Sequence, residues 1–412
     1  MSTVESPTIT GFWIKNYKGL KQIAVGSSFS KSIVAIDMDL SPYDLTRLTT
    51  FIGPSGVGKS TILDAFGFLN DCLKEGLSAA LDKRGGFDAI YHNGGTGPIS
   101  IGCAFQACSI PMPLTYAVSI EKRGEAPFID TEILVYRDNT EATGSKLVLL
   151  FQNGDKNIRH IAPLQGVPLI ELDRIKRIDN RKLGLAALGL FEEVPDVPQL
   201  KNSLEGFHLA YYTPDSAQGL SPMSFKQDRG MRLFTEFKRM EEKFPYELNS
   251  ILKVIASRMP TMEDISYVKS ESGRIHLVFK KKGVEKPFFA QQMSESSLRF
   301  FVHMLLLEDP VPIPFIGIEE PDSGMDDFHI RAFANAVRNH VNMHGASQFF
   351  ITTHHPSLAD YMDPQDVWII HENNDGETAV QRAYDELVYK EVDINSIGPG
   401  WYTEWLFRKS FY

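Results

Sequence analysis

The sequence predicts an α/β protein, in which a mixed sheet and an antiparallel subdomain are interrupted by a mainly helical insertion. Three observations predict this fold class. A buried strand, a glycine-rich loop and an amphipathic helix follow one another over residues 47–69. Runs that are typical of antiparallel strands fill residues 99–152. From residue 294 onward helices and strands alternate, as in a largely parallel sheet covered by helices.

The composition is that of an ordinary globular protein. The 412 residues are too many for one simple domain, and 43% of them are hydrophobic. The 42 basic and 52 acidic residues give a net charge of −10, which argues against a protein that coats nucleic acid through bulk positive charge. The sequence has three cysteines, no apolar run long enough to span a bilayer and no secretory leader. These features indicate a cytoplasmic protein without a membrane segment.

The chain divides into three expected parts. Residues 1–155 form an N-terminal lobe with the glycine-rich loop, residues 156–262 form the mainly helical insertion, and residues 263–412 form a C-terminal lobe. Alternating apolar residues predict strands, and apolar residues at three- and four-residue spacing predict helices. The expected strands are 9–17, 20–25, 48–52, 99–106, 114–121, 128–137, 146–152, 265–268, 275–281, 313–318, 348–352, 367–371 and 377–383, and the expected helices are 62–81, 231–243, 246–258, 294–307 and 326–343.

The strongest motif is the glycine-rich loop, which fits G-x-x-x-x-G-K-[ST] at every fixed position. In such loops backbone N–H groups turn toward phosphates, and the N-terminus of the following helix adds unpaired donors. We expect Lys59 to bridge the β- and γ-phosphates and the Ser60 hydroxyl to bind Mg²⁺. A glycine-rich turn that matches by accident is the alternative. The predicted contact residues are Gly53, Pro54, Ser55, Gly56, Val57, Gly58, Lys59, Ser60 and Thr61.

A pair of carboxylates follows the expected strand at 313–318. Burying Glu319 and Glu320 side by side is costly unless cations meet them, and a phosphate-bound Mg²⁺ would supply that compensation. We expect Glu319 to support the magnesium shell and Glu320 to orient or deprotonate the attacking water. Two exposed glutamates that open a loop are the alternative.

A histidine follows the next expected strand, at 348–352. His354 at that strand end can donate a hydrogen bond to a γ-phosphate and so report its presence. A structural histidine with satisfied hydrogen bonds is the alternative. Its position after the acidic pair favours the phosphate contact, and His354 joins Lys59 and Glu320 as a predicted catalytic residue.

These three motifs, in this order, resemble the ABC-type ATPase heads of the RecF, SMC and OLD proteins, and in particular a group of stand-alone bacterial ATPases related to RecF. Further matches are Asn-Tyr-Lys-Gly-Leu at 16–20 and Arg-Gly-Gly-Phe at 84–87. Met-Ser-Glu-Ser-Ser-Leu-Arg-Phe at 293–300 resembles the signature motif of these heads. The resemblance covers nearly the whole chain and is weakest from about residue 140 to 270.

The resemblance implies heads that pair face to face on ATP, so that each signature serine reaches the partner's γ-phosphate. Ser294 would take that role, at the N-terminus of its helix. The usual signature glycine is Ser296 here, which makes close backbone approach to the phosphate less secure. The D-loop at 322–326 departs from the commoner sequence, and Gln106 is a candidate for the Q-loop glutamine.

The indicated function is an ATP- and Mg²⁺-dependent ATPase that forms a dimer or higher oligomer on ATP. It would drive or gate a separate effector, such as a nuclease or toxin, that acts on nucleic acid. Similar solitary heads look like components of bacterial anti-phage defence systems, so the resemblance implies a role in defence. Two alternatives stay open: a recombination or repair ATPase of the RecF type that binds DNA directly, and a slow-turnover scaffold or sensor held by nucleotide. A transporter subunit fits less well, because of the long insertion.

Overall fold

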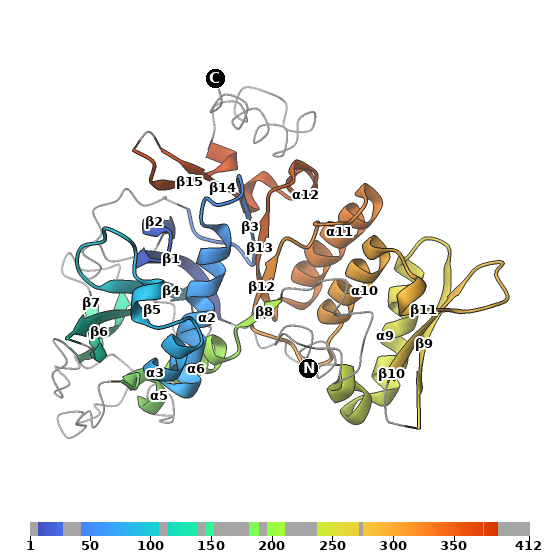
Figure 1. The fold of residues 1–412 in the computed structure, drawn as a ribbon, viewed down its shortest axis with the longest axis horizontal. Coiled ribbons are helices and arrows are strands. Elements are labelled where there is room, and N and C mark those ends of the chain that lie inside the picture. The colour runs from blue at the N-terminus through green and yellow to red at the C-terminus, as the bar shows by residue number, and fades with distance from the viewer. Residues whose placement is uncertain are drawn as a thin grey trace.

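A computed structural model describes residues 7–27, 43–106, 114–124, 126–137, 145–151, 181–188, 196–210, 237–271, 275–373 and 375–385. These residues form two six-stranded sheets and one three-stranded sheet. Figure 1 shows a central sheet with the antiparallel sheet on one side, and with α9, α10, α11 and the three-stranded sheet on the other. Among the described residues no helix has the length and apolarity required to cross a bilayer.

The central sheet has the strand order β15-β14-β3-β13-β12-β8. Its neighbours are parallel except for β15, which is antiparallel to β14. β3 and β13 are buried along their whole length, as expected for strands covered on both faces. The bounds are β3 (Leu48–Ile52), β8 (His208–Ala210), β12 (Phe315–Glu319), β13 (Gln348–Thr353), β14 (Val367–Glu372) and β15 (Thr378–Arg382).

The register of the central sheet brings three strand ends together. Glu319 of β12 is paired with Thr352 of β13, and Thr352 is paired with Phe51 of β3. Because these strands are parallel, the loops that follow them leave the sheet at one edge. In open parallel sheets this carboxyl-terminal edge is where ligands bind.

The second sheet is antiparallel throughout and has the order β2-β1-β4-β5-β6-β7. Gly102 of β4 lies under the indole of Trp13 of β1, where an added Cβ would come within 2.1 Å of the ring. Only glycine allows this close packing. The bounds are β1 (Thr8–Tyr17), β2 (Leu20–Gly26), β4 (Ile99–Gln106), β5 (Leu114–Arg123), β6 (Ala126–Arg137) and β7 (Ser145–Phe151).

α2 (Lys59–Glu75) packs between the two large sheets. Its side chain Phe66 contacts Phe12 of β1 and Phe350 of β13, with ring centroids 5.2 Å and 5.5 Å apart. A second apolar core on the other face joins the central sheet to the later helices. Further helices in the described residues are α3 (Leu77–Asp82), α4 (Phe87–Ile90), α5 (Gly184–Leu188), α6 (Asp196–Glu205), α9 (Pro245–Arg258), α10 (Glu295–Leu307), α11 (Asp327–His344) and α12 (Pro356–Asp360).

Gln348 forms a polar connection between the antiparallel sheet and the central one. Gln348, the first residue of β13, is fully buried, and its Oε1 accepts a hydrogen bond of 2.8 Å from the Ile9 N–H. Its Nε2 donates to the carbonyls of Ile9 and Thr46, each at 2.8 Å. The amide thus satisfies three buried backbone groups at the edge opposite to the ligand edge.

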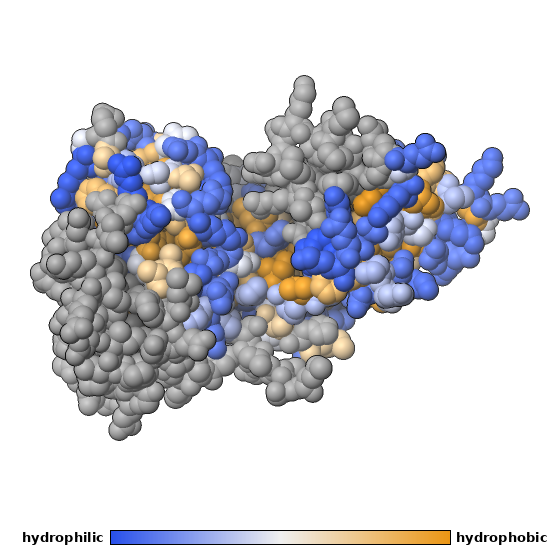
Figure 2. All heavy atoms as spheres, turned by 90° about the horizontal axis from the view of Figure 1, so that it is seen from below, coloured by the Kyte–Doolittle hydropathy of each residue, from blue (hydrophilic) through white to orange (hydrophobic). Residues whose placement is uncertain are grey.

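The third sheet has the order β11-β10-β9, with bounds β9 (Met262–Lys269), β10 (Ile275–Lys281) and β11 (Phe288–Phe289). It packs against α9 and forms the end of the molecule away from the antiparallel sheet (Figure 1). Figure 2 shows that apolar patches lie among hydrophilic side chains on this half of the molecule. The exposed large apolar side chains on α9, on the three-stranded sheet and in the loop between β10 and β11 are Tyr246, Val254, Val268, Val284 and Phe289.

Most of the expected elements are confirmed, with shifts of one or two residues at their ends. The expected helix at 62–81 is wrong as one element, because Gly76 at φ 89° ends α2 and α3 begins at Leu77. β8, in the middle of the expected insertion, was not predicted and is an edge strand of the central sheet. Of the expected helix at 231–243, residues 237–243 are helical and the rest lies outside the described residues.

Candidate functional site

The glycine-rich loop leaves the carboxyl end of β3 and leads into α2. Gly56 and Gly58 have φ values of 90° and 102°, which L side chains rarely adopt, so both positions require glycine. Gly58 is the N-cap residue of α2, and the first turn of this helix holds no acidic side chain. Its unpaired N–H groups therefore favour an anion. Ser60 is exposed in the same turn.

The side chain of Lys59 folds back into the loop. Its Nζ donates hydrogen bonds of 2.7 Å to the carbonyls of Gly53 and Pro54, and only 4% of the residue is exposed. Burial lowers the pKa of Lys59, while the charges of Glu320, Asp322 and Glu319 act in the opposite direction. These carboxylates lie close enough to interact with the ammonium group, although about 260 residues separate them along the chain.

The acidic pair leaves β12 at the same edge. Glu319 is the last residue of the strand, and Glu320 has a φ of 44°, which is rare for a residue with a side chain. The Glu320 N–H donates to the Thr352 carbonyl at 3.0 Å, so the turn stays attached to β13. Strained backbone of this kind occurs preferentially at functional sites, where the surrounding structure maintains it.

A third carboxylate, Asp322, lies beneath the acidic pair. It is 5% exposed, and its Oδ2 accepts a hydrogen bond of 2.7 Å from the hydroxyl of Thr353. Burial raises the pKa of Asp322, and the bond from Thr353 partly offsets that effect. Among the described residues, Asp322 Oδ1 has no hydrogen-bond partner. The site therefore contains a buried acceptor oxygen beside the two predicted glutamates.

His354 contacts the predicted base. Its Nδ1 lies 3.1 Å from Oε1 of Glu320, and both side chains are partly exposed. Thr353 orients this segment, because its Oγ1 also accepts a hydrogen bond of 2.9 Å from the His355 N–H. Besides the backbone bond from Glu320 to Thr352, two side-chain contacts link the exits of β12 and β13, namely Glu320 with His354 and Asp322 with Thr353.

The β14–β15 hairpin supports the glycine-rich loop from outside. An added Cβ at Gly53 would come within 2.1 Å of the Ile370 carbonyl oxygen, so the loop and β14 are in direct backbone contact. The hydroxyl of Thr378 in β15 donates to the Val57 carbonyl at 3.1 Å. Both contacts restrict the loop to one path.

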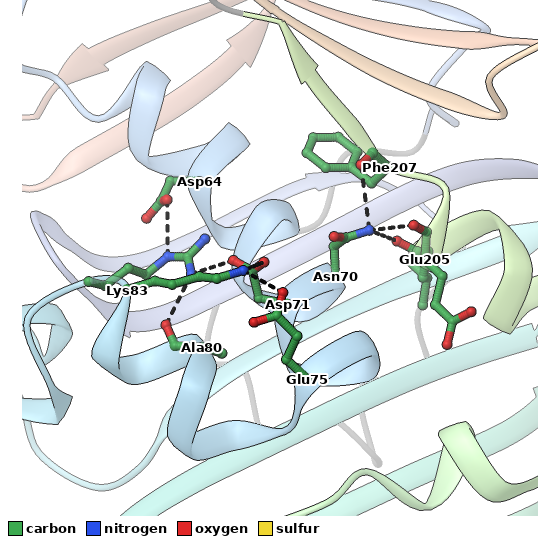
Figure 3. A network of polar contacts seen from close by, with 10 residues as sticks. Asp64, Asn70, Asp71, Glu75, Ala80, Lys83, Glu205 and Phe207 are labelled. Atoms are coloured by element: carbon green, nitrogen blue, oxygen red, sulfur yellow. Dashed lines mark hydrogen bonds and ion pairs between the residues drawn. The ribbon is translucent and has the colours of Figure 1, made fainter. Parts of the chain in front are cut away.

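A polar network fixes α2 at its other end (Figure 3). Lys83 and Arg84 form ion pairs with Asp71, and Arg84 Nε also reaches Asp64 at 3.1 Å. Asn70 Nδ2 donates to the carbonyls of Leu204 at 2.9 Å and Glu205 at 2.6 Å, next to the start of β8. The helix that begins in the glycine-rich loop is therefore joined to the segment after α3 and to the end of α6, which precedes β8.

The structure brings the predicted loop residues, the acidic pair and His354 to one edge, and other contacts place Ser294 and Gln106. Ser294 is the exposed N-cap residue of α10, a helix that packs on α9 and α11. Gln106 pairs with Thr8 beside Ile9, and Ile9 is bonded to the first residue of β13. Gln106 thus lies at the edge opposite to the site, and its candidacy as a Q-loop glutamine is wrong.

Three residues of the site were missed by the sequence analysis. Asp322 had a signal, since it is a third acid directly after the Glu-Glu-Pro sequence. Thr353 and Thr378 had none, because a hydroxyl that orients a neighbour through tertiary contact leaves no pattern in one sequence. Thr378 was counted only as a residue of the expected strand 377–383, and Thr353 comes directly after the expected strand 348–352.

The donor set fits a magnesium nucleotide. Hydroxyl and carboxylate oxygens are the ligands that Mg²⁺ prefers, and it is commonly held by one or two such groups together with substrate phosphates. Ser60 and Glu319 are the residues that would hold it. Within the described ranges, no group of three or more His, Cys, Asp or Glu side chains could bind a metal on its own.

Residues 185–360 match the model of a family described as "AAA domain, putative AbiEii toxin, Type IV TA system". The search of curated proteins found no significant match. Among solved structures, an Smc head bound to the C-terminal winged-helix domain of ScpA is 16% identical, with 90% of this chain and 96% of that chain covered and a TM-score of 0.47. The SMC head domain from Thermotoga maritima is 13% identical, with 91% and 98% covered and a TM-score of 0.41.

A third solved structure is the Smc head domain with an extended coiled coil, bound to the C-terminal domain of ScpA, from Pyrococcus furiosus. It is 13% identical, with 91% of this chain and 96% of that chain covered and a TM-score of 0.48. The family match begins after the glycine-rich loop and covers β12, β13 and the acidic strand end. Residues 185–360 of the chain are thus similar to an AAA-type ATPase domain, as the resemblance of its motifs to ATPase heads predicted.

Proposed function

We propose that the chain binds ATP with Mg²⁺ at the carboxyl edge of its central sheet and hydrolyses it. The observation that carries this proposal is the meeting of the phosphate loop with the acidic end of β12. Lys59 interacts electrostatically with Glu319, Glu320 and Asp322, and β3 is separated from β12 only by β13. Two motifs far apart in sequence thus form one site of the composition that phosphoryl transfer requires.

The roles follow from the geometry. Lys59 would exchange its two carbonyl partners for the β- and γ-phosphates, and the α2 N-terminus would bind the same oxygens. Ser60 and Glu319 would hold Mg²⁺. Glu320 would accept a proton from water, and His354, in contact with Glu320, would bind the γ-phosphate.

The proposal extends to assembly. Ser294 is exposed at the start of α10, and the role expected for it, a contact with a partner's γ-phosphate, requires a second copy. An ATP-bound dimer or higher oligomer meets this requirement. Its effector would be a separate protein that acts on nucleic acid, such as a nuclease or toxin. The toxin–antitoxin description of the matching family and the resemblance to defence ATPases support a role in anti-phage defence.

The test is ATP binding and steady-state hydrolysis by purified protein with Mg²⁺. Lys59→Ala is expected to abolish binding, since it removes the cation that faces the phosphates. Glu320→Gln is expected to bind ATP as the parent does and to lose turnover about 100-fold or more, the scale of a general base. Exposed Lys253→Ala and Glu263→Gln are the matched controls. Unchanged hydrolysis by Glu320→Gln would exclude this residue as the base.

A further inference from the structure

We propose that the Ser296 hydroxyl clamps the start of α10 to the start of α11, so that the signature segment and residues 323–326 move as one unit. Ser296 is then a positioning residue, and it occupies the place where ATPase heads of the resembling kind usually have glycine. The consequence for catalysis rests on the proposed function, whereas the clamp itself can be tested without it.

Ser296 makes three polar contacts with the N-terminus of α11. Its Oγ accepts a hydrogen bond of 3.0 Å from the Asp326 N–H and donates one of 2.9 Å to Asp326 Oδ2. Its Oγ also lies 2.8 Å from Nδ1 of His329. A glycine at position 296 could form none of these bonds, so the serine adds a connection between the two helix starts.

Asp326 and His329 are themselves held in place. Asp326 is the N-cap residue of α11, and its Oδ1 accepts from the His329 N–H at 2.9 Å. Burial acts to raise the pKa of Asp326, but the hydrogen bonds from His329 and Ser296 outweigh it and lower the pKa. The acceptor is therefore ionised at neutral pH, which makes its hydrogen bond with Ser296 charge-assisted.

The imidazole of His329 completes the cluster. The ring is buried against Phe300 of α10, with centroids 5.2 Å apart, so α10 and α11 also meet through apolar contact. Nδ1 lies 2.8 Å from Ser296 Oγ and 2.8 Å from Asp326 Oδ2, whereas Nε2 has no partner in the part of the chain that the structure describes. This environment favours the tautomer with the proton on Nδ1, which donates within the cluster.

A second contact joins the same two segments independently. An added Cβ at Gly324 would come within 2.6 Å of Oε1 of Glu295, and the φ of Gly324 is 75°. Glu295 is the first residue of α10, and it is fixed in turn by Arg299, whose Nε lies 3.2 Å from Oε1. The loop after the acidic pair is therefore packed against α10 through Glu295 and Arg299, which lie on either side of Ser296 in the sequence.

This arrangement has a consequence for the proposed pairing of two copies. Ser294 is two residues before the clamp, and the loop at 323–326 follows Glu320 and Asp322 directly. With the clamp closed, a shift at the acidic strand end moves the signature serine as well. The surface offered to the second copy is then pre-organised, which lowers the cost of association.

The first experiment measures backbone hydrogen exchange by mass spectrometry on the nucleotide-free full chain, in peptides that cover residues 294–300 and 322–330. Ser296→Ala is expected to raise the exchange rate of the Asp326 amide about tenfold, the effect of losing one hydrogen bond. Ser296→Thr keeps the hydroxyl and is expected to restore protection. Ser250→Ala, at an exposed serine of α9, is the control. Unchanged exchange in Ser296→Ala overturns the clamp.

The second experiment measures the ATP-dependent molecular mass of Glu320→Gln protein with and without Ser296→Ala. We expect Ser296→Ala to leave the ATP affinity of one protomer unchanged and to weaken dimerisation about tenfold or more, with rescue by Ser296→Thr. Equal dimerisation overturns the positioning role. If Glu320→Gln itself stays monomeric with ATP bound, the proposed pairing and this role both fail, while the exchange experiment still decides whether the clamp exists.

Discussion

Two buried threonines on neighbouring strands differ in what their hydroxyls do. Thr353 on β13 donates to Asp322 and accepts from the His355 N–H. Thr50 on β3 is equally buried, but its hydroxyl has no partner among the described residues. The Thr353 hydroxyl therefore supports the site through hydrogen bonds, whereas the Thr50 hydroxyl contributes only to packing.

We predict opposite effects of the two Thr→Val changes on stability. Thr353→Val leaves the buried Asp322 carboxylate and a backbone N–H without their partner, so the free energy of unfolding falls by about 1–3 kcal/mol. Thr50→Val removes an unsatisfied buried hydroxyl and is expected to be neutral or stabilising. Urea unfolding of the two variants measures both values, and an equal loss in both would contradict this account.

The same residues show how far the sequence could predict the site. Lys59, Glu319 and Glu320 were predicted because a phosphate loop and a strand-terminal acidic pair are local patterns. Asp322 and Thr353 act on each other across two strand exits, and such a contact exists only after β12 and β13 have paired. Gln106 was misassigned because nothing in a single sequence indicates at which edge of a sheet a strand ends.

At the scale of elements, Asp366 links the short turn after α12 to the start of β3. Its Oδ1 accepts a hydrogen bond of 2.6 Å from the Thr46 hydroxyl. Burial raises the pKa of Asp366 to about 6, with the bond from Thr46 opposing. The folded protein therefore binds this proton more readily than the unfolded chain does, whose aspartate titrates near its ordinary value.

We predict that this carboxyl makes stability fall as the pH rises through about 6. The contribution is present below the ordinary pKa of aspartate and is lost above the folded pKa, because the folded state then holds a partly buried charge. The gain in unfolding free energy of Asp366→Asn over the unmutated protein should therefore be larger at pH 8 than at pH 5, by on the order of 1–2 kcal/mol. Thermal melts across this range test it, with exposed Asp82→Asn as the control. If the stability of Asp366→Asn changed with pH in the same way as that of the unmutated protein, the prediction would be contradicted.

Element boundaries show a second limit of sequence reasoning. The apolar periodicity of residues 62–81 continues through Gly76, so the pattern predicted one helix. Gly76 instead takes a φ of 89°, and its N–H bonds to the Cys72 carbonyl, which ends α2. β8 is only three residues long, and its place beside β12 depends on Asn70, which bonds the carbonyls just before it. Neither feature has a periodic signal.

At the scale of the whole molecule, Gln348 joins the two large sheets at the edge opposite to the phosphate loop. Its amide satisfies three buried backbone groups from β1 and from the segment before β3. The leucine side chain in Gln348→Leu is similar in size to glutamine but cannot form these hydrogen bonds. We predict a loss of about 2–4 kcal/mol in unfolding free energy, since several buried groups are left unpaired.

The measurement is denaturant unfolding of Gln348→Leu beside Gln365→Leu, an exposed glutamine. A loss of stability in Gln348→Leu alone supports the connection between sheets. Equal stability of the two variants would show that Gln348 does not join them.

The fold class was predictable at this scale, because alternating helices and strands with a phosphate loop restrict the architecture to few possibilities. The strand order of the central sheet was not predictable. It depends on which strands pair across long separations, such as β3 with both β13 and β14. Ser294 is exposed at the start of α10, where a second copy can reach it, and this makes the assembly the central question.

The most direct test of the account is native mass spectrometry of Glu320→Gln protein with ATP and Mg²⁺, compared with ADP. Nucleotide held between the phosphate loop and the acidic end of β12, without turnover, predicts a dimer or higher oligomer that retains one ATP for each chain, and monomers with ADP. A chain that retains no ATP, or that releases ADP at the rate of the unmutated protein, would contradict the account.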